Sequence, residues 1–110
     1  MATDTDIPVA ITDEARAWIA QLGMQREFEQ MLDHTKQCVS GLQAIEVFLD
    51  PDLSGQIGPG IIIFSYRDHP GGEDDPTDRA WGQWKIGTFP PEVWTNFVMM
   101  SIYGTPNHGR

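Results

Sequence analysis

Apolar side chains recur every three to four residues in two segments near the N-terminus, a spacing that predicts amphipathic helices. The first segment lies between Thr12, a suitable N-cap, and Gly23, a residue type that readily adopts the left-handed conformation ending a helix. The second segment covers residues 25–39. Its apolar stripe consists of Phe28, Met31, Leu32, Thr35, Cys38 and Val39. We therefore expect two consecutive helices.

The apolar period then shortens to two, which predicts strands. Residues 44–49 alternate, with Ile45, Val47 and Leu49 on one face. Residues 60–66 form a run rich in β-branched residues that is apolar on both faces. The short connection between the two runs predicts an antiparallel pair. We expect the second strand to be central, because an edge strand apolar on both faces promotes aggregation.

A third helix is expected to begin at Asp75, whose side chain is a good N-cap, and Pro76, which suits the first helical position. Two prolines after Phe89 end it, and residues 91–94 are expected to form one further helical turn. Residues 97–103 are apolar and rich enough in β-branched positions to predict a third strand.

These elements follow the order α-α-β-β-α-β and predict an α+β two-layer domain with helices packed on a small, largely antiparallel sheet of about three strands. The 110 residues suit one domain. We expect this domain to cover residues 12–104, after a flexible lead at 1–11 and before a frayed tail at 105–110.

The start of the chain has no basic and apolar signal pattern, and no apolar run approaches the length of a membrane span. The single cysteine, Cys38, excludes an internal disulfide and suits a reducing compartment. Together these features favour a cytoplasmic protein.

The net charge of −9 disfavours binding to nucleic acids and anionic membranes, because both carry negative charge. It favours a basic protein surface, a cationic ligand or a divalent metal. Solubility alone is the alternative explanation for the charge.

One loop resembles the opening of an EF-hand calcium site, with oxygen ligands at Asp50, Asp52 and Ser54 followed by Gly55. The position of the bidentate glutamate, however, is occupied by Ile61. This departure makes calcium a weak candidate and favours a hairpin loop in which the side chains cap backbone amides.

A second metal candidate pairs His34 with Cys38 one helical turn later, with His69 or His108 brought in by the fold. Cys38 also fits the apolar stripe of its helix, so a small buried thiol is the simpler interpretation. No phosphate-binding loop is present in the sequence, and we predict no cofactor and no metal.

Polar residues at the exit of the second strand predict a pocket lined by Tyr66, Arg67, His69 and Trp84. Asp68 and His69 are adjacent, so on extended backbone they point to opposite sides and do not form a relay. No serine or cysteine has the sequence context of a catalytic nucleophile, so we predict no catalytic residue.

Tryptophans concentrate in the third helix and the turn after it. Trp81 and Trp84 share a helical face, and Lys85 and Trp94 follow. Acidic residues precede them at Glu73, Asp74, Asp75 and Asp78. Exposed, this set would be an aromatic centre with an acidic rim that binds a basic partner. Buried, the same stripe would close one side of the sheet.

The sequence therefore favours a small, acidic, non-enzymatic interaction module of the antitoxin, immunity or inhibitor kind. Its partner is expected to be a basic protein, with a homodimer as the other option. The alternative is a small enzyme or ligand-binding domain that uses the pocket at the end of the second strand.

Overall fold

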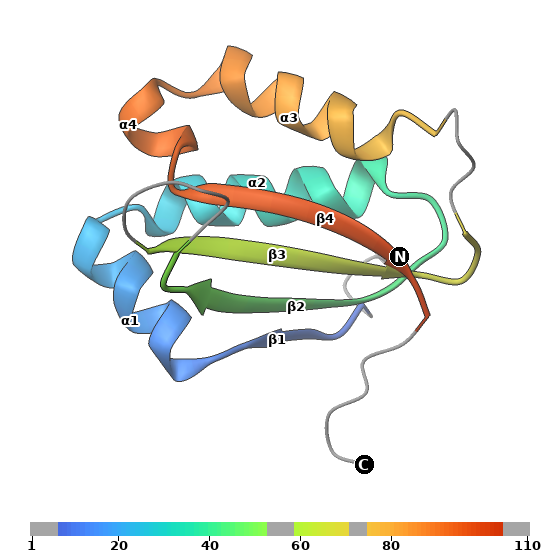
Figure 1. Ribbon diagram of the computed structural model, residues 1–110, viewed down its shortest axis with the longest axis horizontal. Helices are drawn as coiled ribbons and strands as arrows, with labels where there is room; N and C mark the ends of the chain where they lie inside the picture. The colour runs from blue at the N-terminus through green and yellow to red at the C-terminus, as the bar shows by residue number, and fades with distance from the viewer. Residues whose placement is uncertain (1–6, 53–58, 71–74, 105–110) are drawn as a thin grey trace.

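The computed structural model describes residues 7–52, 59–70 and 75–104. It shows a mixed α+β domain, as expected from the sequence (Figure 1). The elements in chain order are β1 (Val9–Ile11), α1 (Asp13–Leu22), α2 (Gln25–Cys38), β2 (Leu42–Asp50), β3 (Gly60–Arg67), α3 (Thr77–Thr88), α4 (Pro91–Trp94) and β4 (Phe97–Tyr103).

Local sequence signals set the ends of the predicted helices. The Thr12 side chain accepts a hydrogen bond from the Ala15 amide and caps α1, and Gly23 ends this helix with a φ of 71°. At the start of α3, an Asp75 carboxylate oxygen accepts from the Thr77 amide, although the N-cap is Pro76, one residue later than expected. Each helix therefore begins and ends close to where the sequence places it.

The sheet differs from the prediction in strand number and in direction. It has four strands in the order β1-β2-β3-β4. The β2–β3 pair is antiparallel as predicted, whereas β1 pairs with β2 and β4 pairs with β3 in parallel. The prediction of a three-stranded, largely antiparallel sheet was therefore wrong. Helices α1 and α2 connect β1 to β2, and α3 and α4 connect β3 to β4. These crossover connections allow the two strands of each connected pair to run in the same direction.

The additional strand, β1, lies in the segment that we expected to be a flexible lead. It has three residues, Val9–Ile11, too few to show an alternating pattern. It is held in the sheet by its pairing with β2, and the Ile45 amide donates to the Pro8 carbonyl at 2.9 Å. Contacts distant in sequence therefore order this segment.

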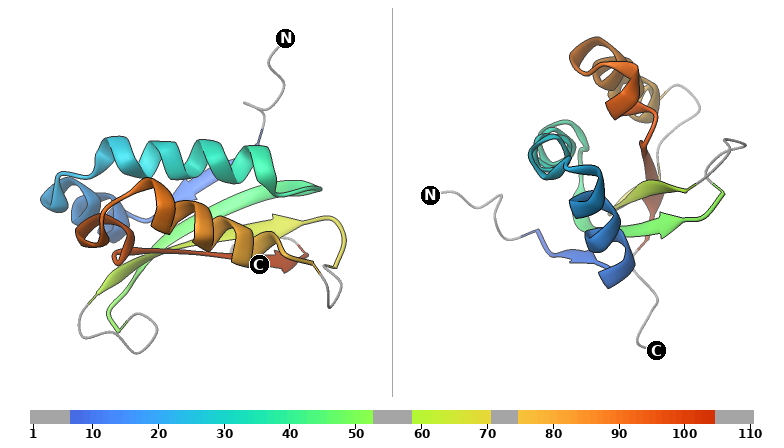
Figure 2. Two further views of the ribbon diagram at one scale, coloured as in Figure 1. Left: turned by 90° about the horizontal axis from the view of Figure 1, so that it is seen from above. Right: turned by 90° about the vertical axis from the view of Figure 1, so that its left-hand side faces the viewer.

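The hydrophobic core lies between the helices and one face of the sheet. Figure 2 shows α2 and α3 side by side over the twisted sheet. Odd-numbered strand residues point into this core. They include Ile45, Val47, Ile61, Ile63, Phe97 and Met99, and they pack with Ala15, Ile19, Phe28, Met31, Trp81 and Val93 from the helices. No helix in the described part of the chain is long and apolar enough to cross a bilayer.

The other face of the sheet consists of the even-numbered strand residues apart from Leu42, which a register shift before Ala44 places against the core. We call it the open sheet face, and its large side chains are Phe48, Ile62, Phe64, Tyr66, Val98, Met100 and Ile102. None of these residues belongs to the core on the helix side or packs against it. The described helices therefore leave this face without a second layer.

Candidate functional site

Trp81 lies in the core and not on the surface. Its side chain is 1% exposed, and its indole Nε1–H donates to the Thr35 hydroxyl at 2.9 Å. That hydroxyl donates in turn to the Met31 carbonyl at 2.8 Å. The buried indole therefore has a partner on α2, and the side chain closes the space between α2 and α3. For Trp81, the interpretation of the tryptophan stripe as packing is the one the structure shows.

Trp84 is partly buried and stacks on His34. The two ring centroids are 3.8 Å apart, with an angle of 4° between the planes. Burial lowers the pKa of the His34 imidazole. The His34–Cys38 metal candidate gains no support from this arrangement, because no three metal-binding side chains come together among residues 7–52, 59–70 and 75–104. His108 lies outside these described residues.

Lys85 connects the helical layer to β4. Its Nζ donates to the Phe97 carbonyl at 2.7 Å and lies 5.8 and 5.5 Å from the ring centroids of Trp81 and Trp94. Burial lowers the pKa of the ammonium group. The cation–π role expected of Lys85 is thus directed inward, where it joins α3 to β4 and α4. The predicted rim residues Glu73 and Asp74 lie outside the described residues.

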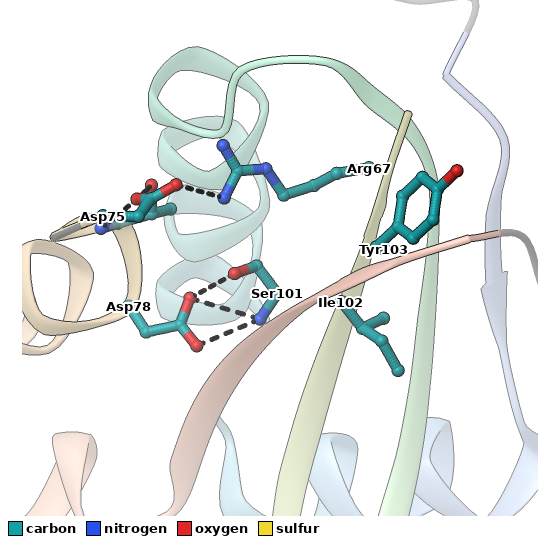
Figure 3. Close-up of a pocket in the computed structure, with 7 residues that line it drawn as sticks. Arg67, Asp75, Asp78, Ser101, Ile102 and Tyr103 are labelled. Atoms are coloured by element: carbon teal, nitrogen blue, oxygen red, sulfur yellow. Dashed lines mark hydrogen bonds and ion pairs between the residues drawn. The ribbon is translucent and has the colours of Figure 1, made fainter. Parts of the chain in front are cut away.

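A pocket of about 240 Å³ lies at the end of β3, close to the place predicted from the sequence (Figure 3). It is lined by Arg67, Asp75, Thr77, Asp78, Ser101, Ile102 and Tyr103. Of the four predicted lining residues, only Arg67 contributes. Tyr66 points to the open sheet face, and Trp84 packs against α2.

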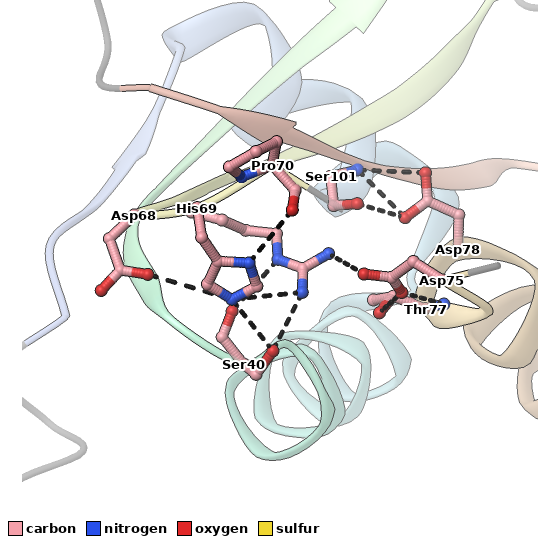
Figure 4. A network of polar contacts seen from close by, with 9 residues as sticks. Ser40, Asp68, His69, Pro70, Asp75, Thr77, Asp78 and Ser101 are labelled. Atoms are coloured by element: carbon pink, nitrogen blue, oxygen red, sulfur yellow. Dashed lines mark hydrogen bonds and ion pairs between the residues drawn. The ribbon is translucent and has the colours of Figure 1, made fainter. Parts of the chain in front are cut away.

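Arg67 is the centre of the polar network beside this pocket (Figure 4). The residue is 3% exposed, and its Nη1 pairs with Asp75 at 2.9 Å. Its Nε donates to the Ser40 carbonyl at 3.1 Å, and its Nη2 donates to the Ser40 hydroxyl at 2.9 Å. Hydrogen bonds from Thr77, together with Arg67, lower the pKa of Asp75 to about 2. The guanidinium thus joins β3, the end of α2 and the start of α3.

The geometry around His69 does not form a catalytic relay. Its Nε2 lies 3.3 Å from the Ser40 hydroxyl, and its Nδ1 donates to the Pro70 carbonyl at 3.3 Å. The Asp68 carboxylate lies 3.9 Å from the same Nε2 that faces Ser40. In a serine–histidine–aspartate relay the carboxylate binds the opposite ring nitrogen. Asp68 therefore occupies the wrong side of the ring for this chemistry.

The remaining acid at the pocket, Asp78, is bound to β4. Its carboxylate accepts from the Ser101 amide at 3.2 Å and from the Ser101 hydroxyl at 2.6 Å. Asp75, Asp78 and Arg67 are thus all hydrogen-bonded to neighbouring residues. This pattern is typical of groups that fasten a helix to a sheet.

The loop that resembles an EF-hand uses its first aspartate as a turn residue. An Asp50 carboxylate oxygen accepts from the Asp52 amide at 2.9 Å, which is the Asx-turn expected as the alternative to calcium binding. Ser54 lies outside the described residues.

The open sheet face carries a row of aromatic rings, of which the sequence analysis singled out only Tyr66, as a pocket residue. The centroids of Phe48 and Phe64 are 5.2 Å apart, and those of Phe64 and Tyr66 are 6.2 Å apart. The Tyr66 hydroxyl donates to a Glu46 carboxylate oxygen at 2.6 Å. Burial, followed by the hydrogen bond and the charge of Glu46, raises the pKa of Tyr66 to about 12.

The β4 side of the open sheet face is the more exposed. Met100 is 43% exposed and Ile102 is 44% exposed. At the described strand positions on this face, the charged side chains are Glu46 and Asp50, and both are acidic. The described strand positions of this face are therefore apolar with two acidic side chains, of which Glu46 already accepts from Tyr66.

One sequence signal does point to this surface. Residues 60–66 are apolar on both faces, whereas a two-layer fold covers a sheet on one face only. A central position gives this strand a neighbour at each edge but does not cover its second face. Together the two predictions imply an apolar face without a covering layer.

The chain matches no protein-family model, no curated protein and no solved structure in our comparisons. The geometry alone therefore supports the functional argument.

Proposed function

We propose that the chain is a protein-interaction module that binds a basic partner protein through its open sheet face. A role of the antitoxin, immunity or inhibitor kind is one in which binding is the whole activity. The observation that carries the proposal is the row of apolar side chains on β2, β3 and β4 that no described helix covers.

The energetic argument rests on the two large exposed apolar side chains of this face, both on β4, because Ile62 on β3 is 8% exposed and adds little. Met100 and Ile102 each keep more than two fifths of their surface exposed. Completing their burial against a partner contributes about 1 kcal/mol each, since full burial of such a side chain is worth about 1.5–3 kcal/mol. Contiguous apolar surface of this kind marks interaction sites in soluble proteins.

Charge selects the class of partner. The net charge is −9, and the charged strand residues on the open sheet face, Glu46 and Asp50, are acidic. A second copy of the chain would bring like charges together, whereas a basic protein would be attracted. The charge therefore favours a basic partner over a homodimer.

The test compares charge substitutions on and off the face. Ile102→Glu places a carboxylate on the open sheet face, and Ile86→Glu is the matched control on α3, where Ile86 is 54% exposed. Each full-length protein is immobilised and exposed to an extract of the cells that express it. Retained proteins are identified, purified and titrated against each variant by calorimetry.

We expect a basic protein that binds the wild-type chain and the Ile86→Glu variant alike. Its affinity for Ile102→Glu should be at least about tenfold lower, equivalent to about 1.4 kcal/mol. Equal binding to all three proteins would overturn the proposal. A wild-type homodimer that Ile102→Glu converts to a monomer, measured by sedimentation, would also overturn it.

A further inference from the structure

We infer that the partner binds the open sheet face as an amphipathic α-helix with basic flanks, and not as a strand added to an edge of the sheet. This inference rests on the proposed function and specifies how the partner binds. It follows from the state of the two sheet edges, from the pairing of the strands and from the charge on the face.

The edge of β4 is capped by side chains of α3. The Asn96 carbonyl accepts from the Ile61 amide at 2.8 Å, and the Gly104 amide donates to the Arg67 carbonyl at 3.0 Å. Even-numbered positions therefore bond to β3, and odd-numbered positions direct their backbone groups to the outer edge.

Two of these outward groups are taken by α3. The Ser101 amide donates to Asp78, and the Phe97 carbonyl accepts from Lys85 at 2.7 Å. An added strand would have to displace both side chains. Charged side chains that occupy an edge are a known protection against strand addition.

The opposite edge offers little backbone for pairing. It is formed by β1, which has three residues, and α1 begins at Asp13, two residues after the strand ends. Edge strands this short are another common protection against strand addition. Both edges therefore disfavour a strand, and the face is the surface that remains.

The strand pairing indicates what covers the face. Two of the three strand pairs are parallel, and each parallel pair is connected through helices that pack on the same side. Parallel sheets typically have helices on both faces, and their strands are therefore apolar on both sides. β3 fits that description, with Ile61 and Ile63 toward the core and Ile62 and Phe64 toward the open sheet face. A helix from the partner would supply the missing layer.

The charge on the face indicates the flanks of that helix. Glu46 and Asp50 lie on the same face of β2, on either side of Phe48. A helix whose apolar stripe contacts Phe64, Met100 and its neighbours would place its flanking side chains over β2. Lysine or arginine there would be attracted to the two carboxylates.

Two synthetic peptides of equal composition test the inference. Both are about 18 residues of leucine and lysine, long enough to form a helix on a surface. One has leucine at helical spacing, and the other alternates leucine and lysine as a strand does. A third peptide repeats the helical pattern with glutamate in place of lysine. Calorimetry measures affinity, and amide chemical shifts locate the binding surface.

We expect the basic helical peptide to bind and to shift amides of β3 and β4. Ile102→Glu should weaken it at least about tenfold, whereas Ile86→Glu changes it less than about twofold. The alternating peptide and the glutamate peptide should bind at least about tenfold more weakly. Asp78→Ala, which frees the Ser101 amide, should strengthen the alternating peptide alone.

Other outcomes separate the two proposals. Tighter binding of the alternating peptide to wild type would overturn the helical partner, and the proposed function would stand if Ile102→Glu weakened that binding. If no peptide binds, the inference that the partner binds as a helix is wrong. The capture from the cell extract then tests separately whether a basic partner protein exists. Equal binding to wild type and Ile102→Glu would count against both.

Discussion

Replacing Thr35 with Val tests how much the hydrogen bond from the buried Trp81 indole contributes to stability. The Thr35 hydroxyl accepts the Trp81 indole N–H at 2.9 Å, and both residues are buried. Valine has nearly the same shape and a similar helix propensity, so Thr35→Val removes the acceptor and leaves the packing. The consequence is a buried indole N–H without a partner. Leaving such a donor unsatisfied costs about 1–3 kcal/mol.

The cost should appear as a lower melting temperature and lower free energy of unfolding. For 110 residues the entropy of unfolding is about 0.23 kcal/mol/K, so we expect a decrease of about 4–13 °C. Urea unfolding monitored by tryptophan fluorescence gives the free energy. Thr95→Val is the matched control, because the exposed Thr95 hydroxyl donates to the carbonyl four residues earlier but accepts from no buried indole.

We expect the control to change stability by less than about 0.5 kcal/mol. A Thr35→Val protein as stable as the control would refute the argument, since the indole N–H would then not depend on Thr35. The inward position of Trp81 would in that case need a different physical cause.

Two glycines should respond to alanine in opposite ways. Gly41→Ala should destabilise by at least about 1–2 kcal/mol, because Gly41 has a φ of 70° and a Cβ there would clash with the Asp68 carboxylate. Gly82→Ala, in open space within α3, should stabilise by up to about 1 kcal/mol. Thermal unfolding measures the melting temperature of each variant, and a change of the same sign and size in both would contradict the predicted difference between the two positions. Asp75, with its pKa lowered to about 2, stabilises the fold above the unfolded-state pKa near 4, and this contribution is lost as pH falls through about 2. Asp75→Asn should therefore be less stable than wild type at pH 7, with a difference that shrinks toward pH 2; a constant difference would show that the ionised carboxylate, held by Thr77 and Arg67, is not its source.

The parts of the fold that the sequence predicts are those with local signals. The side chain of Thr12 and the backbone of Gly23 define α1 within a few residues of it. The alternation in residues 44–49 and the apolar run at 60–66 are also local signals, and the short connection between them predicts the antiparallel pair that the structure shows. Each of these features depends on neighbours in the sequence.

The parts that were missed depend on distant contacts. β1 is ordered by β2, which starts more than thirty residues later, and the parallel direction of β4 depends on the path of α3. Trp81 is buried in the core, and its indole N–H is satisfied by Thr35, 46 residues earlier in the chain. No local pattern reports these pairings.

The candidate site changed position for the same reason. The aromatic residues with the strongest sequence signal, Trp81 and Trp84, pack in the helical layer. The surface that remains is formed by Phe64, Met100 and their neighbours, which look like ordinary core residues in the sequence. The run that is apolar on both faces hinted at this surface, and the position of the described helices on one side of the sheet identifies the residues that they leave without a covering layer.

The most direct test of this account is the oxidation of two adjacent methionines. Met99 is 4% exposed and points into the core, whereas Met100 is 43% exposed on the open sheet face. Hydrogen peroxide converts accessible methionine to the sulfoxide, and fragment mass spectrometry resolves the two positions. We predict that Met100 of the folded protein is oxidised well before Met99, and that the basic helical peptide protects it. Equal protection of both methionines in the isolated protein would contradict the claim that this face of the sheet is open.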